Sequence, residues 1–312
     1  DMKRVLTGIF AAALSVGLCF STVGCGDVKE GSKIEKCVVT LVSEGKEIPI
    51  EVELYMNYTG STIEHFKYLA GKNYYDGTIV SNAKDYVEFG LLDSSRNALD
   101  DKYASIITND YASKLTFVND NTRKRYTSAN TIVGEFYKNG FQDKNGKTAN
   151  PLTLDGALVL KRGLDKVSVD GQTIYEENTG KGVFAFTFGT TSYFSSADEF
   201  AILGKVVKDN ATDDEKSSYD RLKALMTDNA STEYYYTFVC KEVGHKCNEY
   251  GHRFRKADNG DIERYVNGEW VVMDSEDENV KTFLEEFNKN GKYASVLPKK
   301  DITVKSIEFK KK

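Results

Sequence analysis

The chain has 312 residues, with 42 Lys and Arg against 47 Asp and Glu, which gives a formal net charge of -5 at neutral pH. This length is enough for one large domain, or for a domain that carries insertions. The modest negative charge does not favour nucleic acid, so no nucleic-acid partner is expected. The abundant charged residues indicate a solubilising surface.

The first 24 residues read as a targeting segment. Lys3 and Arg4 precede an apolar run at 5–20, which is too short to span a bilayer as a mature helix. Residues 21–25 (STVGC) resemble a bacterial lipobox, in which Cys25 would receive the lipid. Thr22 stands where Leu is usual, so an ordinary signal peptide is the alternative. The sequence therefore predicts a signal peptide at 1–24, a lipid-anchored tether at 25–35, and an extracytoplasmic position on the bacterial cell membrane.

Residues 36–90 predict a hairpin, a short helix and a further strand. The segments 38–42 and 47–55 alternate apolar and polar residues around a turn at 44–46. A helix then begins at Gly60 and ends at Gly71. Its apolar residues share one face: Ile63, Phe66, Leu69 and Ala70. A turn at 74–77 leads into a strand that begins at 78–80.

The middle of the chain predicts two strands with polar segments around them. Residues 91–130 are polar, and the spacing of their scattered apolar residues is compatible with a helix. The segment 155–160 is predicted as a strand, and 163–181 as a hairpin or excursion. The segment 182–190 alternates as a strand, with Phe184, Phe186 and Phe188 on one face and Val183, Ala185, Thr187 and Gly189 on the other.

The last third predicts helices on either side of a small sheet. A capping box at 212–215 is expected to start a helix whose apolar face contains Tyr219, Leu222, Leu225 and Met226. Residues 233–242 predict a strand, and two Asn-Gly turns, at 259–260 and 267–268, indicate a three-stranded meander after it. Residues 276–290 form an amphipathic pattern, and 301–309 predict a closing strand.

Five of these segments, in this order, resemble the cyclophilin family of peptidyl-prolyl cis-trans isomerases. They are 62–66 (TIEHF), 74–79 (YYDGTI), 132–140 (IVGEFYKNG), 156–162 (GALVLKR) and 200–207 (FAILGKVV). The resemblance implies a mainly β fold, a cyclophilin-like closed β-barrel with two capping helices and α/β insertions. The domain would cover 36–310, with insertions at about 93–130 and 231–300.

The residues that carry the family's chemistry are mostly absent. Cyclophilins place an Arg near the prolyl nitrogen and carbonyl, beside a hydrophobic pocket for the ring. Asn82 stands where that Arg is expected, or Ser81 if a one-residue gap lies differently, and neither is charged. At the other groove positions, Tyr86 keeps the aromatic character of the family, and Phe89 and Ala185 each replace a Gln. Thr187 replaces a Phe of the pocket, and Phe200 lies near the position of a pocket His.

Loss of the Arg alone removes a charge-assisted hydrogen bond worth about 1.5–3 kcal/mol, which predicts a rate lower by about ten- to hundredfold. Lys161 or Arg162 follows a groove strand and could reach in, although an exposed, solvated cation is the alternative. The resemblance therefore implies an isomerase-like extracytoplasmic lipoprotein that binds Xaa-Pro segments of secreted proteins, with weak or no catalysis. The alternative is a non-catalytic peptide- or protein-binding module at the cell surface. We expect a monomer without a cofactor.

One further cluster could serve that alternative. Its residues follow the pattern C-x4-H-x-C-x4-H: Cys240, His245, Cys247 and His252. Four such ligands could bind zinc in a tetrahedral site. Outside the cell, Cys240 and Cys247 could instead form a disulfide, and Cys37 is a further thiol that could be buried or paired. A cluster with neither role is the third alternative. His65 has no predicted acid or nucleophile beside it, so a structural role is expected.

Overall fold

The computed structural model describes residues 33–95, 97–107, 131–141, 145–148, 150–163, 166–169, 172–175, 180–209, 216–230, 233–235, 253–257, 259–266, 269–273, 276 and 295–310. The predicted signal peptide, Cys25, most of the tether and most of the helix at 276–290 lie outside these residues. Within them, no helix is both long and apolar enough to cross a membrane.

The first two strands and the last strand form one edge of the main sheet. β1 (Ile34–Ser43) and β2 (Lys46–Tyr55) form the predicted hairpin. Glu44 and Gly45 turn the chain with φ values of 50° and 75°. β14 (Ile302–Phe309) pairs antiparallel with the free side of β1, so the predicted closing strand joins the first strand of the domain.

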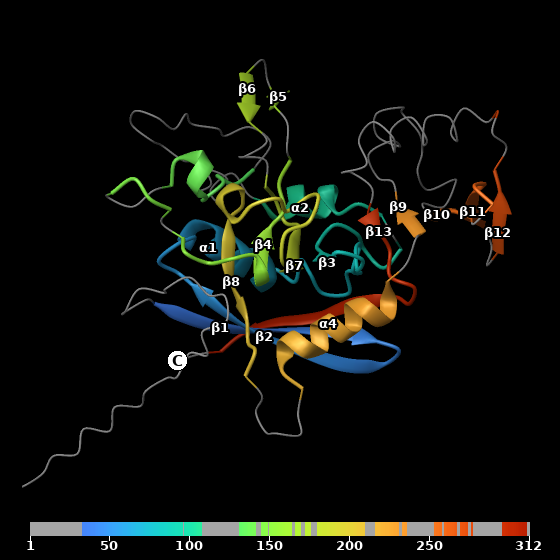
Figure 1. Cartoon of the computed structure of the whole chain (residues 1–312), viewed down its shortest axis with the longest axis horizontal. Helices are drawn as coiled ribbons and strands as arrows, with labels where there is room; N and C mark the ends of the chain where they lie inside the picture. Colours follow the sequence, from blue (N-terminus) through green and yellow to red (C-terminus); the bar gives the residue numbers. More distant parts are fainter. Residues whose placement is uncertain are drawn as a thin grey trace, which may run out of the picture.

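Four further strands complete a seven-stranded antiparallel sheet of order β14-β1-β2-β8-β4-β7-β3 (Figure 1). Their bounds are Ile202–Val206 for β8, Asp155–Leu160 for β4, Phe184–Phe188 for β7 and Tyr86–Phe89 for β3. At the crossing of β8 and β2, Gly204 is required because a Cβ there would lie 2.0 Å from the Glu53 carbonyl oxygen.

Residues 77–82 connect the two edges of this sheet. On one side the Val80 N–H donates to the Ile302 carbonyl and the Val304 N–H donates to the Thr78 carbonyl, both at 2.8 Å. On the other side the Ser81 N–H donates to the Glu88 carbonyl at 2.9 Å. The strand predicted from residue 78 is therefore a bridging segment whose partner changes within a few residues, which prevents a regular ladder. The seven strands form a nearly closed barrel.

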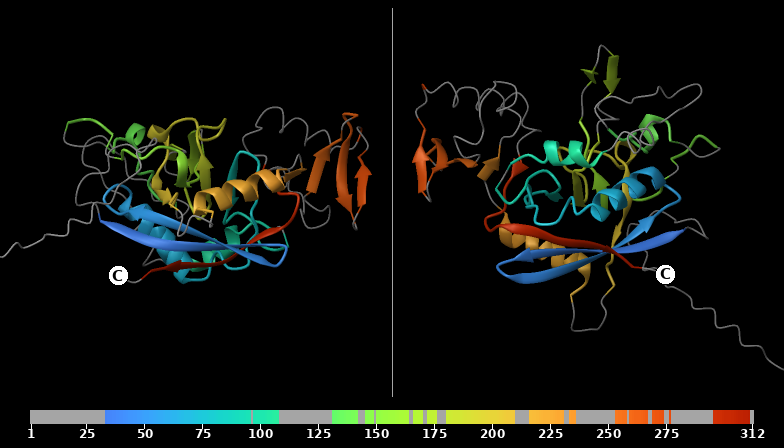
Figure 2. Two further views of the ribbon diagram at one scale, coloured as in Figure 1. Left: turned by 60° about the horizontal axis from the view of Figure 1, so that its bottom comes forward. Right: turned by 180° about the vertical axis from the view of Figure 1, so that it is seen from behind.

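Helices α1 (Gly60–Gly71) and α4 (Ser218–Asn229) pack against this barrel on different strands (Figure 2). α1 contacts β14 and β8, and α4 contacts β2. The predicted apolar face of α1 is buried, and so are Leu222 and Leu225 of α4. The predicted start of α4 is wrong, because its N-cap is Ser217, whose hydroxyl accepts from the Asp220 N–H at 3.1 Å.

Smaller elements lie around the barrel. α2 (Asp100–Ile106) falls in the predicted insertion at 93–130, and β5 (Lys166–Val169) pairs with β6 (Gln172–Tyr175) as a hairpin. The predicted meander is part of a five-stranded sheet of order β12-β11-β10-β9-β13, which Figures 1 and 2 place to one side of the barrel. Its strands are Glu233–Tyr235 for β9, Arg253–Lys256 for β10, Ile262–Val266 for β11, Glu269–Val272 for β12 and Ser295–Val296 for β13.

Two hydrophobic clusters lie on opposite faces of the strands β3, β7 and β4. The barrel interior contains rings such as Phe66, Tyr75 and Phe184. The outer face carries a second cluster that includes Tyr86, Ala185, Tyr193, Phe194 and Phe200. The expected fold class is thus confirmed: the protein is mainly β, with a nearly closed barrel and few helices. The outer cluster includes three of the six predicted groove residues, Tyr86, Ala185 and Phe200, whereas Phe89 belongs to the barrel interior.

Candidate functional site

The predicted groove positions do not all share one face. Cross-strand pairing places Tyr86 opposite Thr187 and Glu88 opposite Ala185 on the outer face. Phe89 pairs with Phe184 and therefore points into the barrel, because neighbouring residues of a strand face opposite sides. All six predicted positions are buried: Asn82, Tyr86, Phe89, Ala185, Thr187 and Phe200.

The two positions at which the catalytic Arg was sought are both engaged within the chain. Asn82 Oδ1 accepts from the Lys84 N–H at 3.0 Å, which stabilises the turn before β3. Ser81 Oγ donates to Glu88 Oε1 at 2.6 Å. Neither side chain carries a charge, so any cation on this face has to come from another element.

Lys161 supplies that cation from the end of β4. Its Nζ forms an ion pair with Glu88 Oε2 and lies 5.0 Å from the ring centroid of Tyr193 and 6.0 Å from that of Tyr86. The Glu88 side chain is 0% exposed and that of Lys161 is 17% exposed. Burial would lower the pKa of Lys161, but attraction to Glu88 and Tyr193 and the hydrogen bond to Glu88 together raise the pKa above its ordinary value, so the ammonium group stays charged.

Sequence reasoning did not single out Glu88. The available signal was an acidic residue inside the apolar segment Tyr-Val-Glu-Phe of β3, together with Lys161 directly after the apolar strand β4. Because unpaired charges are rarely buried, two opposite charges in buried strands suggest that they are partners. The sequence did not indicate which of the chain's many charges would pair, since these two are 73 residues apart.

Arg162 is held separately on the same side of the barrel. Its guanidinium carbon lies 4.9 Å from the ring centroid of Phe136 and 4.8 Å from that of Phe200. Its Nε donates to the Glu199 carbonyl at 2.9 Å and its Nη1 donates to the Gly163 carbonyl at 2.6 Å. With 8% of its surface exposed, Arg162 is not the solvated cation that the sequence allowed. It packs between two rings and joins neighbouring loops.

Aromatic side chains from the segment after β7 cover the outer face. The Phe194 ring lies 5.0 Å from that of Tyr86 and 4.9 Å from that of Phe200, measured between centroids. Thr191 orders this segment, because its Oγ1 accepts from the Phe194 N–H at 2.9 Å and its N–H donates to the Phe194 carbonyl at 3.0 Å. Burial raises the pKa of the Tyr86 and Tyr193 hydroxyls, so both stay protonated.

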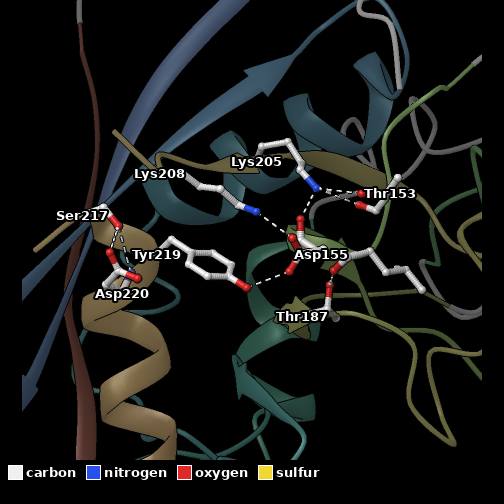
Figure 3. A network of polar contacts seen from close by, with 9 residues as sticks. Thr153, Asp155, Thr187, Lys205, Lys208, Ser217, Tyr219 and Asp220 are labelled. Carbon is white, nitrogen blue, oxygen red and sulfur yellow. Dashed lines mark hydrogen bonds and ion pairs between the residues drawn. The ribbon is translucent and has the colours of Figure 1, made fainter. Parts of the chain in front are cut away.

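Thr187 belongs to a polar network at the far end of this face (Figure 3). Its Oγ1 donates to the Leu154 carbonyl at 2.5 Å. Nearby, Asp155 accepts from Lys208 Nζ at 2.6 Å and from the Tyr219 hydroxyl at 2.7 Å. Burial alone would raise the pKa of Asp155, but these hydrogen bonds hold it below its ordinary value. The network ties the start of β4 to α4, so Thr187 is held as a structural residue.

Lys205 completes the network of Figure 3 from β8. Its Nζ donates to the Thr153 carbonyl at 3.1 Å, to Thr153 Oγ1 at 3.2 Å and to the Asp155 carbonyl. These three acceptors match the three donors of an ammonium group. Lys205 therefore fastens the segment that leads into β4, and its charge is directed away from the Lys161 end of the face.

No group of three or more His, Cys, Asp and Glu side chains that could hold a metal ion occurs within the described ranges. The predicted zinc or disulfide residues Cys240, His245, Cys247 and His252 lie outside them, so their three alternatives stay predictions. Cys37 is a free thiol buried in the barrel, and burial raises its pKa to about 12. It is therefore protonated and unreactive at neutral pH.

No protein-family model and no curated protein sequence matches the chain. A cyclophilin type peptidyl-prolyl cis-trans isomerase from Cryptosporidium parvum matches in structure at 13% identity, over 64% of this chain and 88% of that protein, with a TM-score of 0.35. The Mimivirus cyclophilin matches at 14% identity, over 65% of this chain and 83% of that protein, also at 0.35. At this identity and TM-score, neither match assigns a function to this chain.

Proposed function

We infer that this protein is a cyclophilin-like peptide-binding protein that acts on or holds Xaa-Pro segments of secreted proteins, with weak or no isomerase activity. Two features support the assignment to this class of protein. Five sequence segments resemble the family in the family's order, and the first and last strands pair to complete a barrel with two helices packed against it.

One observation supports low activity above the others: Lys161 and Arg162, the two cations that the described residues place near the expected groove, are already engaged inside the protein. Rotation about a prolyl bond requires loss of amide resonance, which a donor near the prolyl nitrogen assists. Lys161 could act as that donor only by leaving Glu88. Breaking a buried ion pair costs about 3–5 kcal/mol, because the remaining charge is left without a partner.

The same observation favours the second candidate function, a non-catalytic binding module. Beneath its surface this face holds the buried rings of Tyr86, Tyr193 and Phe200, and the charged donors beside them are engaged within the protein. Under either function the predicted lipid at Cys25 would keep the protein outside the cytoplasm on the membrane, where secreted chains emerge. We propose that it works there as a monomer.

An isomerase assay separates the two candidates. The chain from Gly26 onward would be tested by a protease-free method, such as magnetisation exchange, on several Xaa-Pro peptides. We expect a rate about ten- to hundredfold, or further, below that of a cyclophilin that carries the Arg, because a charge-assisted donor is missing. Circular dichroism of the same sample would establish that it is folded.

Normal turnover that is abolished by Asn82→Ala or Tyr86→Ala would contradict the low-activity proposal. Peptide titrations on the same sample test the broader function. If no Xaa-Pro peptide binds to the folded protein at millimolar concentration, the assignment as a proline-segment binder fails.

A further inference from the structure

The groups around the Lys161 ammonium form layers from the protein interior to its surface. Glu88 is fully buried beneath it, and the Ser81 hydroxyl holds the second carboxylate oxygen of Glu88. Tyr193 and Tyr86 flank the ammonium at 5.0 and 6.0 Å. Lys161 is the more exposed member of the ion pair. A ligand that approaches this face would therefore meet Lys161 first and Glu88 only behind it.

A carboxylate in this position acts on Lys161 as an internal ligand. The Lys161 ammonium has three donors, and one of them is given to a charged acceptor inside the protein, where attraction is less screened than in water. A peptide carbonyl is a neutral and weaker acceptor. It gains this donor only if the ammonium leaves Glu88 or is shared with it, so Glu88 competes directly with the ligand.

We propose that Glu88 determines the affinity of this face for peptides, by holding the Lys161 ammonium group that would otherwise bind a carbonyl oxygen of an extended peptide. This inference rests on the proposed function, and it assigns that function a specificity-determining residue. Glu88 acts through Lys161 and is a positioning residue. The peptide carbonyl is the chemical group that Lys161 recognises.

Among the residues that the structure describes, Glu88 is the carboxylate that acts on Lys161. On β3, Tyr86 is uncharged because burial raises its pKa, and on the covering segment the same holds for Tyr193. Arg162, which follows Lys161, is turned toward Phe136 and Phe200 and donates to backbone carbonyls. Asp85, also near this face, helps to raise the pKa of Tyr86 through its negative charge.

The first test is Glu88→Gln, which keeps the shape of the side chain and an acceptor for Ser81 while it removes the charge. The probe is an amino-terminally blocked Ala-Ala-Pro-Phe peptide, titrated calorimetrically at pH 7. We expect the Kd of Glu88→Gln to fall by about tenfold or more, because the charged competitor is gone. Adding Lys161→Met to this variant should remove the gain. Glu35→Gln is the matched control, since Glu35 pairs with Lys67 far from this face.

The pH profile provides a readout that a merely structural role would not change. Glu88 is what raises the pKa of Lys161 against burial, so the pKa of Lys161 should fall in Glu88→Gln. The gain in affinity should therefore disappear as pH rises and Lys161 loses its proton. In the wild type and in Glu35→Gln, the affinity for the peptide should not change over the pH range in which Lys161 of Glu88→Gln loses its proton.

A Kd that is equal in wild type and folded Glu88→Gln, or a gain that persists in the double variant, would overturn the proposal. If Glu88→Gln does not fold, the proposal is tested by magnetic resonance on the wild-type protein. Its Lys161 Nζ resonance should shift when the same peptide saturates the protein, and an unchanged resonance at saturation would count against it. Absence of peptide binding in the wild type and every folded variant would instead refute the proposed function.

Discussion

His65 is a titratable side chain buried in helix α1. Its Nε2 lies 2.9 Å from the Lys181 carbonyl oxygen, and the Tyr103 hydroxyl lies 3.4 Å from the same nitrogen. Burial lowers the pKa of His65 to about 4, although the bond to Lys181 opposes this shift. His65 is therefore neutral at pH 7 and connects α1 to the segment before β7, in agreement with the structural role expected from the sequence.

This burial predicts a loss of stability in mild acid. The folded pKa of about 4 is below the unfolded value of about 6.5, so the unfolded state binds more protons between these values. The free energy of unfolding should therefore fall as pH drops from about 6.5 to 4, by about 3 kcal/mol in total from this residue. His65→Gln keeps an N–H donor but cannot titrate, so its stability should depend less on pH in this window.

Urea unfolding at several pH values between 4 and 7 measures the difference. Tyr103→Phe is the control, because it removes the neighbouring hydroxyl and leaves His65 in place. It should lower stability to a similar degree at each pH. The same pH dependence in wild type and His65→Gln would show that His65 does not cause the acid sensitivity.

At the level of single residues, the sequence identified which positions are chemically unusual but not what they contact. It placed uncharged Ser81 and Asn82 where a catalytic Arg was expected, and it identified Lys161 and Arg162 as the nearby cations. It did not reveal that Arg162 packs between Phe136 and Phe200. Such contacts join residues far apart in the chain, and no local pattern encodes them.

Helix α4 shows how an element's start depends on one side chain. The hydroxyl of Ser217 accepts from the Asp220 N–H at 3.1 Å and donates to Asp220 Oδ2 at 2.7 Å. The predicted capping box at 212–215 lies outside the described residues, and the helix begins after Ser217. Thr212 and Ser217 both precede the apolar pattern of α4 by a few positions. Spacing alone therefore does not show which of them is the N-cap.

Ser217→Ala should lower the free energy of unfolding by about 1 kcal/mol, because the Asp220 N–H loses its acceptor at the start of α4. Chemical denaturation at constant pH would measure this change. Thr212→Ala is the matched control and should leave stability within experimental error. If Thr212→Ala cost as much as Ser217→Ala, the cap assignment from the structure would be wrong.

Regular elements were predicted well where the periodicity was strong. β1, β2, β4, β14 and α1 coincide with their predicted segments within a few residues. The meander at β10 to β12 was also found, although β9 and β13 extend it to five strands. β9 lies at the start of the strand predicted at 233–242, whereas β13 has only two residues and pairs with a strand 60 residues earlier. A two-residue strand has no periodicity that a sequence pattern could detect.

At the scale of the whole molecule, the membrane anchor is the main prediction that rests on the sequence alone. Cys25 follows a lipobox-like segment, and the first barrel strand begins at Ile34. A lipid at Cys25 would therefore leave the eight residues 26–33 between the anchored cysteine and β1. The barrel would then be held close to the membrane surface.

Labelling with a radioactive fatty acid in a bacterial host tests this anchor. The wild-type chain should incorporate the label and fractionate with membranes, whereas Cys25→Ala should do neither, because the acceptor thiol is absent. Cys37→Ala serves as a second control, since Cys37 is buried in the barrel. Equal labelling of the wild type and Cys25→Ala would rule out lipidation at this position.

The sequence by itself determined the fold class, because alternating strands, helical faces and glycine turns are local patterns that burial of apolar surface enforces. It also placed uncharged Ser81 and Asn82 at the positions where the family resemblance leads us to expect an Arg. The tertiary structure decided how residues 77–82 bridge the barrel and how Lys161 is used. The ion pair of Lys161 with Glu88 depends on pairing between distant strands and on a buried environment that only the complete fold creates.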